Sequence, residues 1–99
     1  MYKIVLVMTA KAGKTREAIA GLKAIADYAH KKYDRRLEVH MQVFGGTSGT
    51  FYGTADYKDL ASAQEALARL MADDQYMTLS EKLSEALIGP PTVTLLQPI

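Results

Sequence analysis

Four polar side chains on two predicted strands are the strongest candidates for chemistry in this sequence. The strands cover residues 37–44 and 50–57, and each alternates apolar and polar side chains. A pairing with Phe44 opposite Thr50, around a glycine-rich turn at residues 45–49, collects the apolar side chains on one face. In that register the other face carries a compact polar group, with His40 opposite Thr54: His40, Gln42, Tyr52 and Thr54.

A few convergent polar groups in an apolar setting are typical of a small-molecule site. An imidazole titrates near neutral pH, so we expect His40 and Tyr52 to act as proton-transfer groups, with the pocket between the sheet and the helices. Gln42 and Thr54 would then bind the ligand through hydrogen bonds. The same group is also typical of a hydrogen-bonded seam between two subunits, and both interpretations stay open.

The composition excludes several other chemistries. The chain has no cysteine, which removes disulfides, thiolate metal sites and a cysteine nucleophile, and which suits a reducing cytoplasm. His30 and His40 do not stand at metal-ligand spacing, and no dinucleotide fingerprint is present, so we expect no metal or other cofactor. A net charge of +1 argues against nucleic acid or an anionic membrane as the main partner, and no apolar run is long enough to span a bilayer.

The elements that must position these residues follow from the periodicity of the apolar side chains. Strands are predicted where β-branched residues alternate or cluster, and helices where apolar residues recur at helical spacing, with Asp59 as an N-cap and Gly89 as a C-cap. The expected strands cover residues 2–10, 37–44, 50–57 and 92–97, and the expected helices cover residues 14–34, 59–71 and 79–87.

This order predicts one α+β domain over residues 1–99, with a ferredoxin-like β-α-β-β-α-β arrangement. Its four-stranded antiparallel sheet would carry the helices on one face and leave the other face uncovered. Residues 2–10 are nevertheless apolar on both sides, which is typical of a strand buried on both faces. We therefore expect a homodimer in which a second copy covers the open face; the alternative is a monomer with scattered exposed aliphatic side chains.

The order of elements, the Gly13-Lys14 pair that opens the first helix, and the acidic and aromatic segment at residues 72–82 resemble the dimeric α/β-barrel superfamily. The nearest branches are the NIPSNAP-like proteins and the small antibiotic-biosynthesis monooxygenases. The resemblance implies that the sheets of two copies pair to form a barrel. It also singles out Tyr76, the aromatic residue of that segment, which we include among the ligand-binding candidates.

The sequence departs from the catalytic patterns of these relatives. Haem-degrading members use a histidine in the second helical region and usually a tryptophan, whereas residues 59–87 contain no histidine and the chain has no tryptophan. The small monooxygenases use an asparagine and a tryptophan, and both are absent here. The leading hypothesis is a cofactor-independent monooxygenase or related enzyme acting on a hydrophobic aromatic compound. The alternatives are a non-enzymatic dimeric small-molecule-binding or accessory protein and a purely structural dimer, so the sequence leaves open whether the protein is an enzyme.

Overall fold

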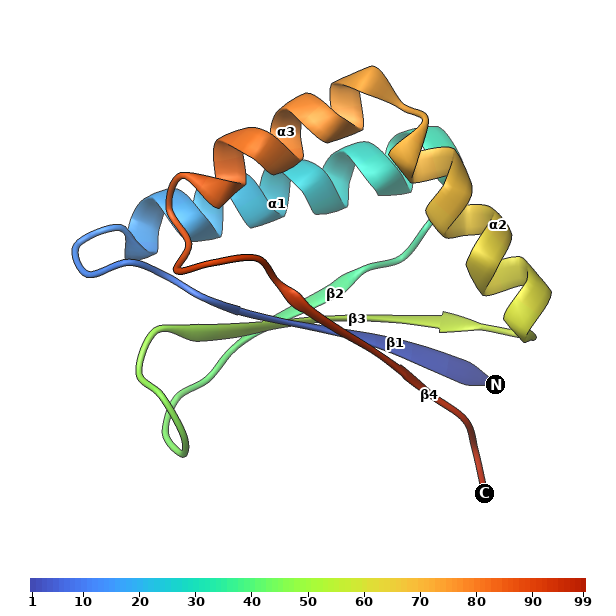
Figure 1. Ribbon diagram of the computed structural model, residues 1–99, viewed down its shortest axis with the longest axis horizontal. Helices are drawn as coiled ribbons and strands as arrows, with labels where there is room; N and C mark the ends of the chain where they lie inside the picture. The colour runs from blue at the N-terminus through green and yellow to red at the C-terminus, as the bar shows by residue number, and fades with distance from the viewer.

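The computed structural model describes all of residues 1–99 and contains a four-stranded sheet with three helices (Figure 1). The predicted order of strands and helices is confirmed. No helix has both the length and the apolar character needed to cross a membrane. In chain order the elements are β1 (Tyr2–Thr9), α1 (Thr15–Tyr33), β2 (Glu38–Met41), β3 (Thr50–Tyr57), α2 (Leu60–Met71), α3 (Asp74–Ser84) and β4 (Thr92–Leu96).

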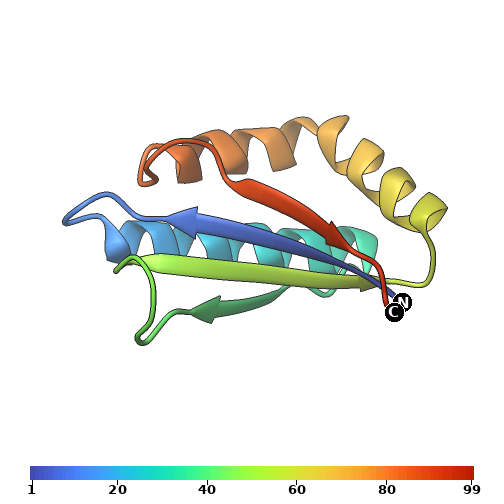
Figure 2. The same ribbon diagram turned by 60° about the horizontal axis from the view of Figure 1, so that its bottom comes forward.

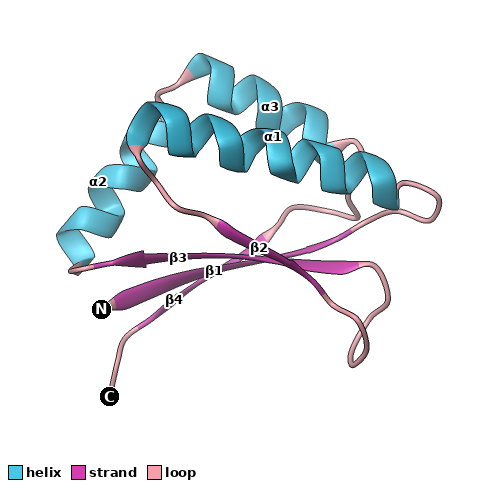
Figure 3. Cartoon of the chain, turned by 180° about the vertical axis from the view of Figure 1, so that it is seen from behind, coloured by secondary structure: helices cyan, strands magenta, loops and turns pink.

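The strands lie in the order β2-β3-β1-β4, and every neighbouring pair is antiparallel. The three helices all lie on one side of the sheet, where α1 and α3 run side by side and α2 crosses one end (Figures 1 and 3). The opposite face has no cover, and Figure 2 shows the four strands beneath the helical layer. The predicted α+β, ferredoxin-like fold is thus confirmed.

Aspartates set the limits of the helices. Asp59 begins α2 and accepts a hydrogen bond from the Ser62 N–H at 2.7 Å, as the sequence predicts. Asp73 begins α3 in the same way, with the Tyr76 N–H at 3.0 Å. Asp34 ends α1 in the left-handed conformation (φ 52°), which an aspartate tolerates better than most residues. This turn directs the chain back towards the sheet.

The hydrophobic core fills the space between the helices and the sheet. Phe51 on β3 and Ile4 on β1 are the largest side chains that are almost completely enclosed. Helices α1 and α3 approach closely at Gly21, where an added Cβ would lie 3.1 Å from Leu83 Cδ1. The main core cluster combines residues from β1, α1, β3 and α3 with the segment after α3: Met8, Ala10, Ala18, Leu22, Ile25, Phe51, Leu83, Ala86 and Leu87.

Two predicted element boundaries are wrong. The last helix was expected over residues 79–87 with Gly89 as its C-cap, but α3 begins at Asp74, where Asp73 caps it, and ends at Ser84. It ends early because the following residues bond to the end of β1 instead, with the Ile88 N–H donating to the Thr9 carbonyl oxygen at 2.8 Å. Gly89 does adopt a left-handed conformation (φ 67°), but within the loop that leads to β4.

The predicted register between β2 and β3 is also wrong, by two residues. Thr54 lies opposite Glu38 and not opposite His40, whose partner is Tyr52. Strand β2 stops at Met41, since the loop over residues 42–49 is held by its own hydrogen bonds: Gln42 Nε2 donates to the carbonyl oxygens of two loop residues. A shift of two residues leaves every side chain on its expected face, because the side-chain period of a strand is two.

Candidate functional site

The four polar side chains predicted to form a site do share one face of the sheet, and it is the uncovered face. His40 and Tyr52 lie directly opposite each other, and the Tyr52 hydroxyl donates to Gln42 Oε1 at 3.1 Å. Thr54 follows on the same face, since it stands two residues after Tyr52. His40 is exposed, whereas the other three are half-buried. Their part in any chemistry stays a prediction.

The expected location of their pocket, between the sheet and the helices, is wrong for His40 and Tyr52. The neighbouring residues Val39 and Phe51 point to the helical side, where Phe51 is only 2% exposed and Val39 packs against the core. Successive side chains alternate between faces, so His40 and Tyr52 must point away from the helices. Any role they have belongs to the uncovered face, where a second subunit would also meet them.

A cavity of about 280 Å³ lies on the helical side of the sheet. Thirteen of its seventeen lining residues are hydrophobic, so its wall is apolar with a few polar groups. Tyr76 lines it, and among the five predicted site residues it is the only one that does. The apolar wall comes from β1, all three helices and β4, and includes Leu6, Met8, Leu22, Ile25, Leu67, Leu70, Met71, Met77, Leu83 and Val93.

Arg35 is the charged residue in the wall of this cavity. It follows the turn at Asp34, and only 8% of it is exposed. Its Nε donates to the Tyr57 hydroxyl at 2.6 Å, but its Nη1 is buried without any hydrogen-bond partner. None of the four ion pairs of the chain involves it. Sequence reasoning missed this residue. Arg35 stands two residues before Leu37, as Leu37 stands two residues before Val39, so the alternation of side chains also predicts that Arg35 points inward.

A second, polar cavity of about 450 Å³ adjoins the first at Arg35 and Leu70, which line both. Its wall mixes cations and carboxylates, among them Arg36, Glu38 and Asp56. Asp56 is paired with a lysine, since Lys3 Nζ lies 3.1 Å from its Oδ1. Thr54 also borders this cavity, at the edge of the sheet. Arg35 therefore stands at the boundary between an apolar space and a polar one.

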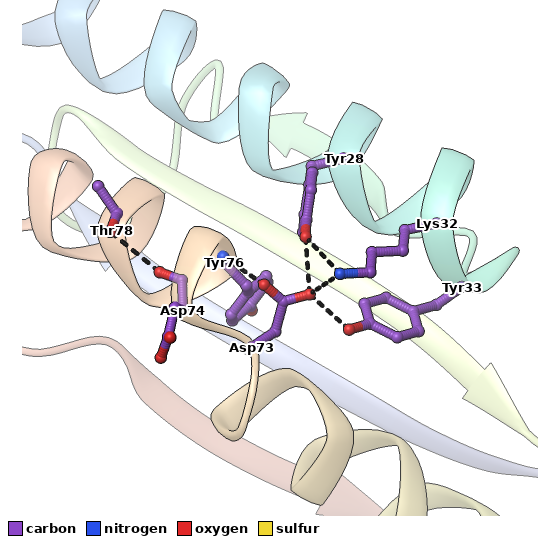
Figure 4. Close-up of polar contacts among 7 residues, drawn as sticks. All are labelled: Tyr28, Lys32, Tyr33, Asp73, Asp74, Tyr76 and Thr78. Atoms are coloured by element: carbon purple, nitrogen blue, oxygen red, sulfur yellow. Dashed lines mark hydrogen bonds and ion pairs between the residues drawn. The ribbon is translucent and has the colours of Figure 1, made fainter.

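A hydrogen-bonded cluster around Asp73 ties α1 to the start of α3 (Figure 4). The side chain of Asp73 is only 4% exposed. Its Oδ2 accepts hydrogen bonds from the Tyr28 hydroxyl at 2.7 Å, from Lys32 Nζ at 3.0 Å and from the Tyr33 hydroxyl. Its Oδ1 accepts the capping bond from the Tyr76 N–H. Every oxygen of this buried carboxylate is thus satisfied, which is typical of a structural group.

The cluster fixes the charge of its members. The hydrogen bonds from Tyr33 and Tyr28 hold the pKa of the Asp73 carboxyl well below its usual range. The bonds to Tyr28 and Asp73 raise the pKa of Lys32, and the bond to Asp73 raises the pKa of the Tyr33 hydroxyl. Near neutral pH the Asp73 carboxylate is therefore ionised and Lys32 is protonated. The role of the cluster is to hold Tyr76 at the cavity wall, and not to exchange protons with a ligand.

No three histidine, aspartate or glutamate side chains come together in an arrangement that could hold a metal ion. His30 is exposed on α1 and does not line the apolar cavity. The groups available for chemistry at the cavity are therefore the Arg35 guanidinium, the Tyr76 hydroxyl and the hydroxyls of Ser80 and Ser84.

Solved structures share this fold over the whole chain. An uncharacterized NIPSNAP domain protein from Burkholderia xenovorans superposes with a TM-score of 0.83 at 21% identity, over 100% of this chain and 95% of that one. The protein Atu4242 from Agrobacterium tumefaciens gives 0.82 at 16% identity, over 100% and 94%. An antibiotic biosynthesis monooxygenase gives 0.77 at 12% identity, over 100% and 99%. No protein-family model and no curated protein sequence matches the chain.

These likenesses confirm the predicted resemblance at the level of the fold. The chain has the architecture of the NIPSNAP domain protein and of the antibiotic biosynthesis monooxygenase. At such low identities the architecture does not carry an activity with it, because one fold serves many functions. The function must be argued from the cavity itself.

Proposed function

We propose that this protein is a homodimer that binds a small, largely apolar molecule in the cavity between its helices and its sheet. The observation that carries the proposal is the cavity of about 280 Å³, whose wall is hydrophobic at thirteen of seventeen positions. Small-molecule sites are concave, mostly apolar and supplied with a few polar groups that fix orientation. The size is near the lower end of such sites, so it suits a compact ligand of no more than about three aromatic rings.

The residues at the mouth of the cavity support the entry of a ligand. Met71 is 68% exposed and Val93 is 57% exposed, although both line the cavity. Met77, on α3, is half-buried at the same cavity. Methionine side chains are flexible and polarizable, and they adapt to ligands of different shape. The mouth therefore lies between α2, α3 and β4.

The uncovered sheet face supports the dimer. Val5 and Val7 of β1 point to this face, and both are half-buried between neighbouring strands. The β2–β3 loop extends beyond the sheet on the side away from the helices (Figures 1 and 3), and it presents Val43 and Phe44 at 85% and 90% exposure. A second copy related by a two-fold axis would bury the face and the loop together.

The second candidate is an enzyme of the cofactor-independent monooxygenase type, and the shared fold of the antibiotic biosynthesis monooxygenase favours it. In such a reaction an activated ring CH₂ group and O₂ give a carbonyl group and water, so that the substrate supplies all four electrons that reduce O₂. No histidine lines the cavity. In the cavity, Tyr76 would have to act as the proton-transfer group for the substrate. His40 and Tyr52 point to the uncovered face, so they could transfer protons only at a site there.

A fluorescent probe tests the binding proposal. N-phenyl-1-naphthylamine is neutral and gains fluorescence when it leaves water for an apolar site. The wild-type protein should bind it, whereas Ser80→Phe should not, because Ser80 lines the cavity and the new ring would fill it. Thr78→Phe is the matched control, since Thr78 is exposed on the same helix and does not line the cavity. Binding that survives Ser80→Phe in a folded variant would place the probe elsewhere and contradict the proposal.

The same cavity variant separates the two candidates. Oxygen uptake with an aromatic ring that carries an activated CH₂ group should be absent for a binding protein. Uptake that is present in the wild type and in Thr78→Phe, and that is lost in Ser80→Phe, would favour the enzyme.

A further inference from the structure

The guanidinium of Arg35 is a buried cation that forms no ion pair. The residue is 8% exposed, none of the ion pairs of the chain includes it, and its Nη1 has no partner. Burial of an ionised group costs much free energy unless the group is paired and fully hydrogen-bonded. Arginine does not escape this cost by losing its proton, because a guanidinium stays protonated in proteins. The fold alone therefore leaves Arg35 incompletely satisfied.

The location of Arg35 indicates what would satisfy it. The residue lines both the apolar cavity and the adjoining polar cavity. Its Nε is already bound to the Tyr57 hydroxyl, which holds the guanidinium in one orientation at the boundary. A molecule whose apolar body fills the first cavity can therefore present one polar group to the guanidinium of Arg35 at the boundary.

We propose that the ligand of this cavity is a hydrophobic organic acid whose carboxylate accepts a hydrogen bond from the guanidinium of Arg35. The inference rests on the proposed binding function and adds the charge of the ligand. Hydrogen bonds between an arginine and a carboxylate are about twice as strong as neutral ones, and a low-dielectric setting strengthens them further. The ligand would supply the counter-charge that the fold lacks.

The surroundings favour a single negative charge on the ligand. Glu38 and Asp56 line the polar cavity beside Arg35, and Asp56 is partly neutralised by Lys3. Their carboxylates would repel a dianion such as a phosphate monoester more strongly than a carboxylate. Arg69 also lines the polar cavity but already bonds to Glu65, and Arg36 lines the polar cavity but not the apolar one. Arg35 is thus the cation that remains free for the ligand within the apolar cavity.

A matched pair of ligands tests this assignment. 2-Naphthoate and 2-naphthamide have the same ring system and nearly the same shape, but only the first is charged at pH 7. Calorimetric titration of the wild-type protein should show that the acid binds about 10- to 100-fold more tightly than the amide, which is the range of one charge-assisted hydrogen bond. Arg35→Met should remove this difference and leave the affinity for the amide within about threefold. Arg16→Met, at an exposed arginine that lines neither cavity, should preserve it.

Each other outcome has a distinct meaning. Equal affinity of the wild type for acid and amide would overturn the assignment of the carboxylate and leave the proposed binding function intact. Failure of both ligands and of N-phenyl-1-naphthylamine to bind would overturn the binding function, and this assignment with it. The wild-type comparison does not depend on the variants, so it decides the question even if Arg35→Met fails to fold.

Discussion

Replacement of Arg35 by methionine should make the ligand-free protein more stable. The substitution removes a buried guanidinium that no carboxylate pairs, and it adds an unbranched apolar side chain to a wall that is already apolar. Replacement of buried charges by apolar residues of similar size stabilises proteins by about 1–4 kcal/mol. The loss of the hydrogen bond to Tyr57 offsets about 1 kcal/mol of this gain. The net effect of about 0–3 kcal/mol corresponds to a rise in Tm of up to about 20 °C for a domain of this size.

Thermal and urea unfolding followed by circular dichroism at pH 7, without ligand, measure this effect. Arg36→Met is the control, because Arg36 is exposed and its loss should change stability by less than about 0.5 kcal/mol. A residue kept for ligand binding at the expense of stability is typical of a functional site. A fall in Tm for Arg35→Met would show that the fold itself satisfies the guanidinium, and the reasoning about its missing counter-charge would be refuted.

Three further predictions concern the rest of the molecule. Sedimentation of the wild-type protein at micromolar concentration should give about twice the 10.9 kDa chain mass. Val7→Lys places a charge on the uncovered face and should give a monomer, whether folded or unfolded. A monomeric wild-type protein would contradict the dimer. Asp73→Asn should lower stability most at pH 7 and progressively less as the pH falls below about 4: the folded pKa of Asp73 is lowered, so its contribution is fully present above the ordinary carboxyl pKa of about 4 and is lost only as the pH falls from there through the lowered folded pKa. A difference that stays constant with pH would contradict this. His40→Ala should weaken the dimer and leave the binding of N-phenyl-1-naphthylamine unchanged, because His40 lies on the face opposite the cavity; loss of probe binding would argue against that separation.

The order of the elements and the division of the strands into faces could be predicted from the sequence because both depend on short-range periodicity. The alternation of residues 37–44 placed Val39 and His40 on opposite sides of the sheet, and the structure agrees. The register was missed because it depends on the loop, where the side chain of Gln42 bonds to the backbone of residues 45 and 47. Such side-chain bonds within a loop leave no periodic signal in the sequence.

The candidate site was harder to predict, since cavities arise from the packing of distant segments. The apolar cavity joins residues from β1, α1, α2, α3 and β4, so no single stretch of sequence marks it. The sequence does contain an indication for Arg35. It stands two residues before Leu37 and four before Val39, so in an extended segment its side chain points to the same, inward side. The preference of arginine for the surface outweighed this signal, because an unpaired arginine is rarely buried. Tyr76 was found through a resemblance, and the structure places it at the cavity.

The methionine methyl groups offer the most direct test of the claim that the cavity holds the ligand. The chain has five methionines. Met8, Met71 and Met77 line the cavity, whereas Met1 and Met41 do not. With ¹³C-methyl-methionine labelling, addition of 2-naphthoate should shift the methyl resonances of the three cavity methionines through the ring current of the bound ligand and leave the other two unchanged. Shifts confined to Met1 and Met41, or no shifts at saturating ligand, would contradict the account.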